Sequence, residues 1–245
     1  MFERERTLPC RDLVNRIELS SPSRIVDLGC GPGNSTAVLA QKWPNAEILG
    51  VDSSIEMLKQ ARASRIKAEW ILEDIQRWNS ERGFDLVFSN AALQWIADHE
   101  REIPRLFNSV ANGGALAFQI PTRTDLWNEV LEKLVTNPSW ANRFRPVTSN
   151  DFFSHKLEFY YSVLSNLSKQ IDLWETKYIH ILPTPEAVVE WTKGTALRPL
   201  LDRLKDANMR NEFLAEYTRE ITKAFPSQDG KILFPFLRRF VVAYR

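Results

Sequence analysis

The sequence predicts an α/β domain built on a doubly wound, mostly parallel sheet of seven strands, with a mainly helical insertion. In the first half of the chain, short apolar or β-branched runs alternate with stretches whose apolar residues lie three and four apart, as in strands connected by helices. After Pro121 the alternation stops and helical stretches dominate. The 245 residues, 44% hydrophobic and 26% charged, are typical of one large globular domain rather than a disordered chain.

The first half supplies most of the expected sheet and its crossover helices. Strands are expected at residues 24–28, 47–51, 69–72, 85–89 and 115–120. Helices are expected at 34–42, 55–62 and 101–110, each long enough to connect two parallel strands. Because the elements alternate in this way, we expect helices on both faces of the sheet.

The second half is expected to be mainly helical, with two further strands. The helices are expected at 126–134, 152–164, 185–191, 199–204 and 210–223. Two strand-like runs, 171–182 and 231–244, have no helix-length segment between themselves and the sheet. We therefore expect both as antiparallel strands at the sheet edge.

The composition disfavours several classes of protein. The 32 basic and 31 acidic side chains leave a net charge of +1, without the basic excess that nucleic-acid binding requires. The longest uncharged run, 106–122, contains polar residues, so no membrane span is expected. The charged start at 1–6 does not fit a signal peptide, and we expect a cytoplasmic protein. Cys10 and Cys30, with three scattered histidines, predict neither a disulfide framework nor a metal site.

A glycine-rich turn follows the first expected strand and leads into the helix expected at 34–42. Its glycines are Gly29, Gly31 and Gly33, and such a turn lets the backbone approach a ligand closely. A dinucleotide fingerprint, G-x-G-x-x-G, would place its third glycine at Asn34, so the spacing disfavours NAD. The G-x-G-x-G spacing after an acidic residue resembles motif I of the doubly wound S-adenosylmethionine-dependent methyltransferases.

This resemblance implies a set of contacts with S-adenosylmethionine. The glycine turn would pass under the methionine part of the cofactor, and Asp27 would lie near its ammonium group. Asp52, at the end of the second expected strand, stands where an acidic side chain can accept both ribose hydroxyls of a nucleoside. Asp74 and Ile75 match the family position where a carboxylate accepts from the adenine amino group. A surface turn is the alternative for Asp74.

Residues just after Asp52 have a structural interpretation beside the cofactor one. Ser53 and Glu56 have the spacing of a capping box for the next helix, and Ser53 also belongs to the expected cofactor segment. Met57 either packs on adenine or is a core residue at helical spacing.

The segment after the fourth expected strand lies at the carboxyl end of the sheet, where ligands of such folds bind. Methyltransferases that act on base amino groups resemble one another in an Asn/Asp-Pro-Pro-aromatic stretch here, and residues 89–95 contain none. We expect Asn90 to contact the cofactor. We expect Gln94 and Trp95 to bind the substrate where it faces the cofactor's methyl group, and the aromatic ring can contact the sulfonium. Loop and core positions are the alternatives for these residues.

Beyond motif I, the whole chain resembles the trans-aconitate 2-methyltransferase family, whose members methylate a carboxyl group. Matching stretches in the first half are 2–6, 26–36, 50–54, 90–99 and 119–121. Matching positions in the second half are Tyr160-Tyr161, Tyr178, His180, Pro183, Trp191, Thr195, Leu197-Arg198-Pro199, Arg238 and 240–243. The resemblance implies one methyltransferase domain, 1–245, with a cofactor-binding half at 1–121, a substrate cap at 122–230 that carries an edge strand near 171–182, and a final strand at 231–245.

The chain departs from the family pattern at two places. The family usually begins earlier, with a Trp-x-Pro-x-x-Tyr segment that folds over the cofactor, so we expect a more open cofactor pocket here. Where the family carries Glu-Pro-Ser-His, this sequence has Leu126-Trp127-Asn128-Glu129.

The expected chemistry needs positioning rather than a catalytic acid or base. A carboxylate with a pKa of about 4 is already a nucleophile at neutral pH, so the protein need only align and desolvate the reactants. A small tricarboxylate needs cations and hydroxyl donors for the carboxylates that do not react. The candidates are Tyr160, Tyr178, His180, Arg198 and Arg238.

Several of these candidates also have purely structural interpretations. Tyr160 and His180 could be core residues, and Arg198 could be solvated. Because Arg198 precedes Pro199, we expect it to lie outside the following helix. We expect Arg238 to open the final strand and neither arginine to belong to an ion-pair repeat.

We therefore expect an O-methyltransferase that uses S-adenosylmethionine to form a methyl ester on a small polycarboxylic acid, trans-aconitate by the resemblance. One alternative is methylation of another carboxylic acid, such as a malonyl group on acyl carrier protein. Another is a non-catalytic domain that senses S-adenosylmethionine. The expected partner is a small anionic acid, with neither nucleic acid nor membrane, and the oligomeric state stays open with a monomer as the expectation.

Overall fold

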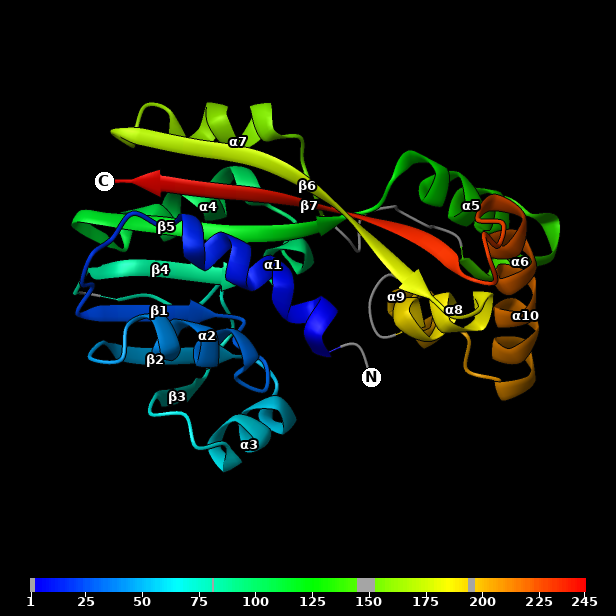
Figure 1. The fold of residues 1–245 in the computed structure, drawn as a ribbon, viewed down its shortest axis with the longest axis horizontal. Helices are drawn as coiled ribbons and strands as arrows, with labels where there is room; N and C mark the ends of the chain where they lie inside the picture. Colours follow the sequence, from blue (N-terminus) through cyan, green and yellow to red (C-terminus); the bar gives the residue numbers. More distant parts are fainter. Residues whose placement is uncertain (1–2, 81, 145–152, 194–196) are drawn as a thin grey trace. The chain divides into compact units, whose positions relative to one another are not determined.

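The computed structural model describes residues 3–80, 82–144, 153–193 and 197–245 (Figure 1). The chain divides into two compact units. We call Met1–Pro121, Phe153–Glu175 and Arg238–Arg245 the sheet unit, and Thr122–Phe152 and Thr176–Leu237 the helical unit. The helical unit differs from the expected insertion at 122–230, because 153–175 returns to the sheet unit.

The strands form one seven-stranded sheet in the order β3-β2-β1-β4-β5-β7-β6. Their bounds are β1 Arg24–Leu28, β2 Glu47–Asp52, β3 Glu69–Leu72, β4 Phe84–Asn90, β5 Val110–Thr122, β6 Gln170–Leu182 and β7 Ile232–Tyr244. β1 pairs in parallel with β2 and β4, β2 with β3, and β4 with β5. The arrow of β7 in Figure 1 runs opposite to those of β5 and β6. The predicted doubly wound, mostly parallel sheet is confirmed.

β7 is an interior strand, and the expectation that it lies at the sheet edge is wrong. It stands between β5 and β6, so only β6 of the two late strands ends the sheet. The run Phe240, Val241, Val242 and Ala243 is fully buried. A continuous apolar run is typical of a strand covered on both faces, so this run was the signal for an interior position.

Helices cover the sheet on both faces. In the sheet unit they are α1 Glu3–Arg16, α2 Asn34–Lys42, α3 Ile55–Ala63, the short 3-10 turn η1 Leu93–Trp95, α4 His99–Asn108 and α7 Leu157–Leu164. α4 and α7 contribute buried side chains to one core that also contains strand residues such as Val26 and Leu116. Figure 1 shows α1 and α2 in front of the sheet and α4 behind it.

Helix α1 was not predicted from the sequence. Pro9 lies inside it, and proline usually interrupts a helix. Cys10, Leu13, Val14 and Ile17 are nevertheless all buried, at the three- and four-residue spacing of a buried helical stripe. The burial of this stripe within the sheet unit stabilises the helix by more than the proline costs.

The helix expected at 152–164 begins later, at Leu157. Residue 152 lies outside the described residues, and 153–156 are not helical. The backbone N–H of Phe153 donates to Gln94 O at 2.8 Å, and Arg239 Nη1 donates to His155 O at 2.8 Å. These contacts, with residues far away in the sequence, keep the segment out of the helix.

The helical unit has its own aromatic core. Its helices are α5 Asp125–Thr136, α6 Pro138–Phe144, α8 Pro185–Lys193, α9 Arg198–Arg203 and α10 Ala207–Ala224, of which only α6 was not predicted. Trp127 is fully buried, its ring lies 5.2 Å from that of Phe234, and its Nε1 donates to Tyr217 Oη at 2.9 Å. Over the described ranges, no helix of either unit is both long and apolar enough to span a membrane.

Tyr217→Phe is expected to destabilise the protein by about 1–3 kcal/mol, because the buried indole N–H of Trp127 would lose its acceptor. The midpoint of urea unfolding measures the change. Tyr161→Phe is the matched control, since Tyr161 is 55% exposed and should change stability by less than about 0.5 kcal/mol. Equal midpoints for Tyr217→Phe and the wild type would contradict the role given to this hydrogen bond.

Candidate functional site

The glycine turn between β1 and α2 is built from residues with positive φ. The φ angles of Gly29, Gly31 and Gly33 are +73°, +56° and +94°, which residues with a side chain rarely adopt. A Cβ at Gly29 would lie 2.2 Å from the Cβ of Ala92, so no side chain fits there. A Cβ at Gly31 would meet nothing within 4 Å, so the turn is open at this residue.

Asp27 is a completely buried carboxylate beneath this turn. Its Oδ2 accepts hydrogen bonds from Ser35 Oγ at 2.7 Å and Thr36 Oγ1 at 2.6 Å. Its Oδ1 is buried and accepts no hydrogen bond from the described residues. Burial raises the pKa of Asp27 to about 6, although the two hydroxyls oppose the shift. A buried acceptor without a donor suits a bound cationic group.

Asp52, the last residue of β2, connects the glycine turn to helix α3. Its Oδ2 accepts from the N–H of Gly31 at 2.8 Å, and its Oδ1 accepts from the N–H of Ser54 at 2.8 Å. A carboxylate offers about four lone pairs, so these two bonds leave room for further donors such as hydroxyl groups.

The expected capping box at Ser53 is wrong, since the N-cap of α3 is Ser54. The Oγ of Ser54 accepts from the N–H of Met57 at 3.3 Å, one residue later than expected. Asp52 binds the N–H of Ser54 and so fixes this start. Ser53 is exposed, and Met57 is 37% exposed, which excludes the core alternative for Met57.

Asp74 and Ile75 follow β3 and begin a tight turn. Asp74 is exposed, and its Oδ1 accepts from the N–H of Gln76 at 2.8 Å. The Cδ1 of Ile75 lies 3.4 Å from the position of a Cβ at Gly29. The segments after β1, β3 and β4 therefore meet around Gly29, at the carboxyl ends of three parallel strands.

A buried polar chain leads from the end of β4 to β7. Asn90 Oδ1 accepts from Gln119 Nε2 at 2.9 Å, and Gln119 Oε1 accepts from Arg238 Nη1 at 3.2 Å. Gln119 and Arg238 are both buried. Arg238 lies in the middle of β7, so the expectation that it opens this strand is wrong. Gln119 was not predicted as a site residue, although a polar side chain in an otherwise apolar strand was the available signal.

Gln94 and Trp95 lie in η1, just after β4. Gln94 is buried, its Nε2 donates to Ala91 O at 2.6 Å, and its Oε1 accepts no hydrogen bond from the described residues. Trp95 is 45% exposed, so it is not a core residue. Of the two, Gln94 presents a fixed acceptor oxygen and Trp95 an accessible ring.

Tyr160 belongs to a buried hydrogen-bond relay rather than to an open site. The N–H of His155 donates to Tyr160 Oη at 3.3 Å, and His99 Nδ1 lies 2.9 Å from the same oxygen. His99 Nε2 lies 2.8 Å from Leu93 O, which only accepts, so Nε2 carries the proton and Nδ1 accepts from Tyr160. Burial raises the pKa of Tyr160 and lowers that of His99. This relay supports η1 and favours the packing interpretation of Tyr160.

The remaining candidates lie in the helical unit. His180 is buried, with its ring 4.4 Å from that of Trp191, and Tyr178 is partly buried on the same strand. Arg198 is exposed, is the first residue of α9 and pairs with Asp202 at 3.8 Å across one helical turn. The expectation that Arg198 lies outside this helix is therefore wrong, because Leu197 rather than Arg198 caps the helix.

Comparison with known proteins agrees with this geometry. Residues 25–114 match the family model described as "Methyltransferase domain". The structure resembles phosphoethanolamine N-methyltransferase 2 of Haemonchus contortus, solved with S-adenosyl-L-methionine, with a TM-score of 0.58 and 16% identity over 97% of this chain and 52% of that one. It also resembles the YcgJ protein of Bacillus subtilis, with a TM-score of 0.61 and 14% identity over 99% and 98% of the two chains. The fold and the glycine turn are together those of the class I S-adenosylmethionine-dependent methyltransferases.

Relatives with more similar sequences identify the family within this class. The chain is 39% identical over 246 residues to trans-aconitate 2-methyltransferase of Rhodopseudomonas palustris (strain HaA2), covering 100% of this chain and 96% of that protein. It is 40% identical over 247 residues to the same enzyme of Variovorax paradoxus (strain S110), covering 100% and 95%. The chain belongs to the trans-aconitate 2-methyltransferase family.

The raised pKa of Asp27 predicts a pH-dependent stability of the ligand-free protein. Because its pKa rises from 3.8 to about 6 on folding, the folded protein binds more protons than the unfolded chain between these values. Its contribution is fully present below about pH 4 and is lost as the pH rises through about 6, a change of about 3 kcal/mol.

The test is urea unfolding of wild type and Asp27→Asn from pH 4 to pH 7.5. We expect the difference in unfolding free energy to move in favour of Asp27→Asn as the pH rises, because the amide cannot ionise. A difference that stays constant over this range would show that the Asp27 carboxyl does not titrate as its burial implies.

Proposed function

We propose that this protein transfers the methyl group of S-adenosylmethionine to a carboxylate of a small polycarboxylic acid, trans-aconitate, and forms a methyl ester. The observation that carries the proposal is the sequence similarity to the trans-aconitate 2-methyltransferases, 39% identity over the whole chain. The buried Oδ1 of Asp27 under the glycine turn supports it.

The residues at the carboxyl ends of β1 to β4 suit this cofactor. The unpartnered Oδ1 of Asp27 can accept from the ammonium of the methionine part, which passes over Gly29, Gly31 and Gly33. Asp52 has acceptor positions for the ribose hydroxyls. The adenine and methyl ends would be contacted by Met57, Asp74, Ile75 and Asn90, with Ser53 at the edge of this set.

The chemistry requires alignment and no proton transfer. S-adenosylmethionine supplies a methyl group on a sulfonium sulfur. The new bond joins a carboxylate oxygen to the methyl carbon while the carbon–sulfur bond breaks and its electrons stay on sulfur. The carboxylate is ionised at neutral pH, so no side chain has to act as a base. The protein therefore contributes by holding the reactants in line and excluding water.

Arg238 is the proposed anchor for a carboxylate that does not react. Its buried guanidinium donates to Gln119, which in turn donates to Asn90 at the end of β4. Gln94 and Trp95 follow Asn90 in the sequence. A buried arginine gives strong charge-assisted hydrogen bonds to a carboxylate. Tyr160 is not proposed as a substrate contact, because its buried hydroxyl is hydrogen-bonded to His99. Tyr178, His180 and Arg198 stay predictions.

Product analysis tests the activity. Incubation with S-adenosylmethionine and trans-aconitate is expected to give the monomethyl ester, identified by mass spectrometry, and S-adenosylhomocysteine in equal amount. Citrate, cis-aconitate and malonyl-acyl carrier protein form the acceptor panel. Methylation of malonyl-acyl carrier protein alone would favour that substrate, and cofactor binding without turnover of any acid would favour a sensor.

Arg238→Ala is expected to lower kcat/KM for the acid by roughly tenfold to a hundredfold, mainly through KM, with the affinity for S-adenosylhomocysteine nearly unchanged. Arg238→Lys should rescue only in part, since an ammonium cannot form a bidentate contact. Arg198→Ala tests the second predicted anchor: a raised KM would keep Arg198 at the substrate site, and a wild-type KM would leave it with its exposed pairing to Asp202. Wild-type KM in Arg238→Ala would remove Arg238 from the substrate site.

A further inference from the structure

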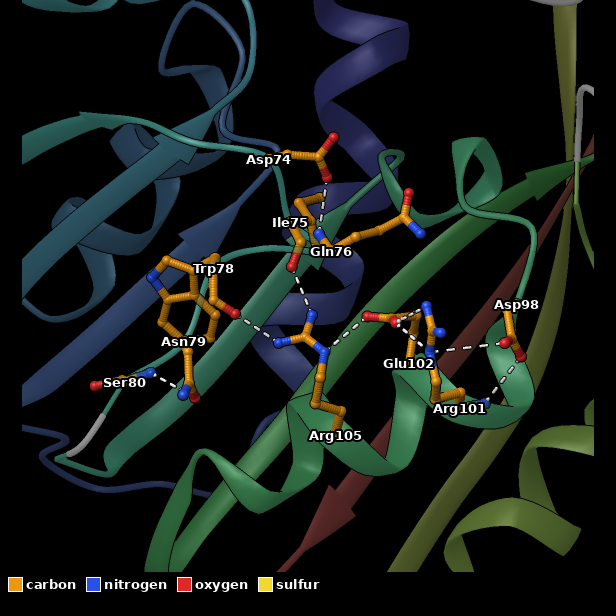
Figure 2. A network of polar contacts seen from close by, with 10 residues as sticks. All are labelled: Asp74, Ile75, Gln76, Trp78, Asn79, Ser80, Asp98, Arg101, Glu102 and Arg105. Carbon is orange, nitrogen blue, oxygen red and sulfur yellow. Dashed lines mark hydrogen bonds and ion pairs between the residues drawn. The ribbon is translucent and has the colours of Figure 1, made fainter.

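One arginine of α4 donates hydrogen bonds to the backbone of the turn that carries Asp74. The guanidinium of Arg105 donates from Nη2 to Ile75 O at 2.5 Å and from Nη1 to Trp78 O at 2.5 Å (Figure 2). Asp74 Oδ1 accepts from the N–H of Gln76, and this N–H belongs to the same peptide unit as the carbonyl of Ile75. Arg105 and the Asp74 carboxylate therefore bind opposite sides of a single planar group.

We propose that Arg105 is a positioning residue for the cofactor's adenine, because it orients the Asp74 carboxylate through the Ile75–Gln76 peptide plane. The inference rests on the proposed function and on the expected contact of Asp74 with the adenine amino group, for which Oδ2 is the oxygen that Gln76 does not bind. With the peptide plane fixed, Asp74 Oδ1 stays on Gln76 and Oδ2 keeps one direction. A cation on the carbonyl also polarises the peptide and strengthens its N–H as a donor to Asp74.

The orientation of Arg105 is itself secured by a buried carboxylate. Glu102, whose side chain is 2% exposed, accepts from Arg105 Nε at 2.7 Å through Oε2. Its Oε1 accepts from Arg101, and Figure 2 shows the two arginines on either side of Glu102. Arg105 thus uses three nitrogens of one rigid fork for three acceptors: Glu102, Ile75 and Trp78. Lysine cannot reproduce this arrangement, because its ammonium is a single point of donation.

Arg101 provides a matched control. It is also an arginine of α4, and it pairs with the same carboxylate, but among the described residues its side chain pairs with Glu102 and Asp98, which belong to α4 and its N-cap. Its side chain is 66% exposed. Arg101→Ala removes a comparable charge without touching the Asp74 turn, so it separates the loss of a cation on α4 from the loss of the contact with the peptide plane.

The experiment compares two ligands by calorimetric titration: S-adenosylhomocysteine, and S-inosylhomocysteine, in which a carbonyl oxygen replaces the amino group of adenine. Wild type should prefer the adenine form, since the Asp74 carboxylate attracts the amino group and repels the carbonyl. Arg105→Ala is expected to reduce this preference by about tenfold, the scale of one hydrogen bond to a charged group. Arg105→Lys should fall in between, and Arg101→Ala should keep the full preference.

The double variant Asp74→Ala/Arg105→Ala decides whether Arg105 acts through Asp74. We expect its preference for the adenine ligand to be no lower than that of Asp74→Ala alone. The reason is that the effects of two substitutions in one contact do not add. A general loss of stability would lower both affinities together and leave their ratio unchanged, so the ratio is the readout.

A full adenine preference in folded Arg105→Ala, or in Arg105→Lys if the alanine variant does not fold, would overturn the inference while leaving the proposed function intact. Wild-type protein that binds neither ligand would overturn the proposed cofactor, and this inference with it.

Discussion

The missing side chain at Gly29 is the constraint on which the rest of the site depends. A single methyl group there would lie 2.2 Å from the Cβ of Ala92 and 3.4 Å from the Cδ1 of Ile75. The segments that follow β1, β3 and β4 can approach one another only because this position is bare. Asp52 then secures the arrangement from the β2 side through its bond to the N–H of Gly31. The segments at the carboxyl ends of four parallel strands are thus brought into contact.

Most of the sheet could be predicted from the sequence, because each buried strand is a short apolar run and each crossover helix has an apolar stripe. The errors have two sources. At 153–156 contacts with distant segments decide, since Phe153 donates to Gln94 O and Arg239 donates to His155 O. At α1 and α3 one local signal overrides another, because a buried stripe outweighs Pro9 and the Asp52 carboxylate accepts from the N–H of Ser54 two residues later.

Some residues of the candidate site could be predicted from the sequence and others could not. The glycines and the acids Asp27, Asp52 and Asp74 lie at or next to the ends of strands, so their positions in the sequence identify them. Their contacts with a cofactor stay proposals. Arg105 and His99 carry no such signal, because what they do depends on partners far along the chain. Tyr160 illustrates the difference, since its position in the family pattern was visible and its burial against His99 was not.

The chain leaves the sheet unit and returns to it twice, and the helical unit therefore has no free end. Each of its two segments is anchored at both of its ends in the sheet unit, so each forms a closed loop even when it is unfolded. Closing a loop removes conformational freedom from the unfolded chain at a cost that grows only slowly with loop length. Once the sheet unit has folded, each segment of the helical unit is a closed loop and loses less conformational entropy on folding than an open chain of the same length.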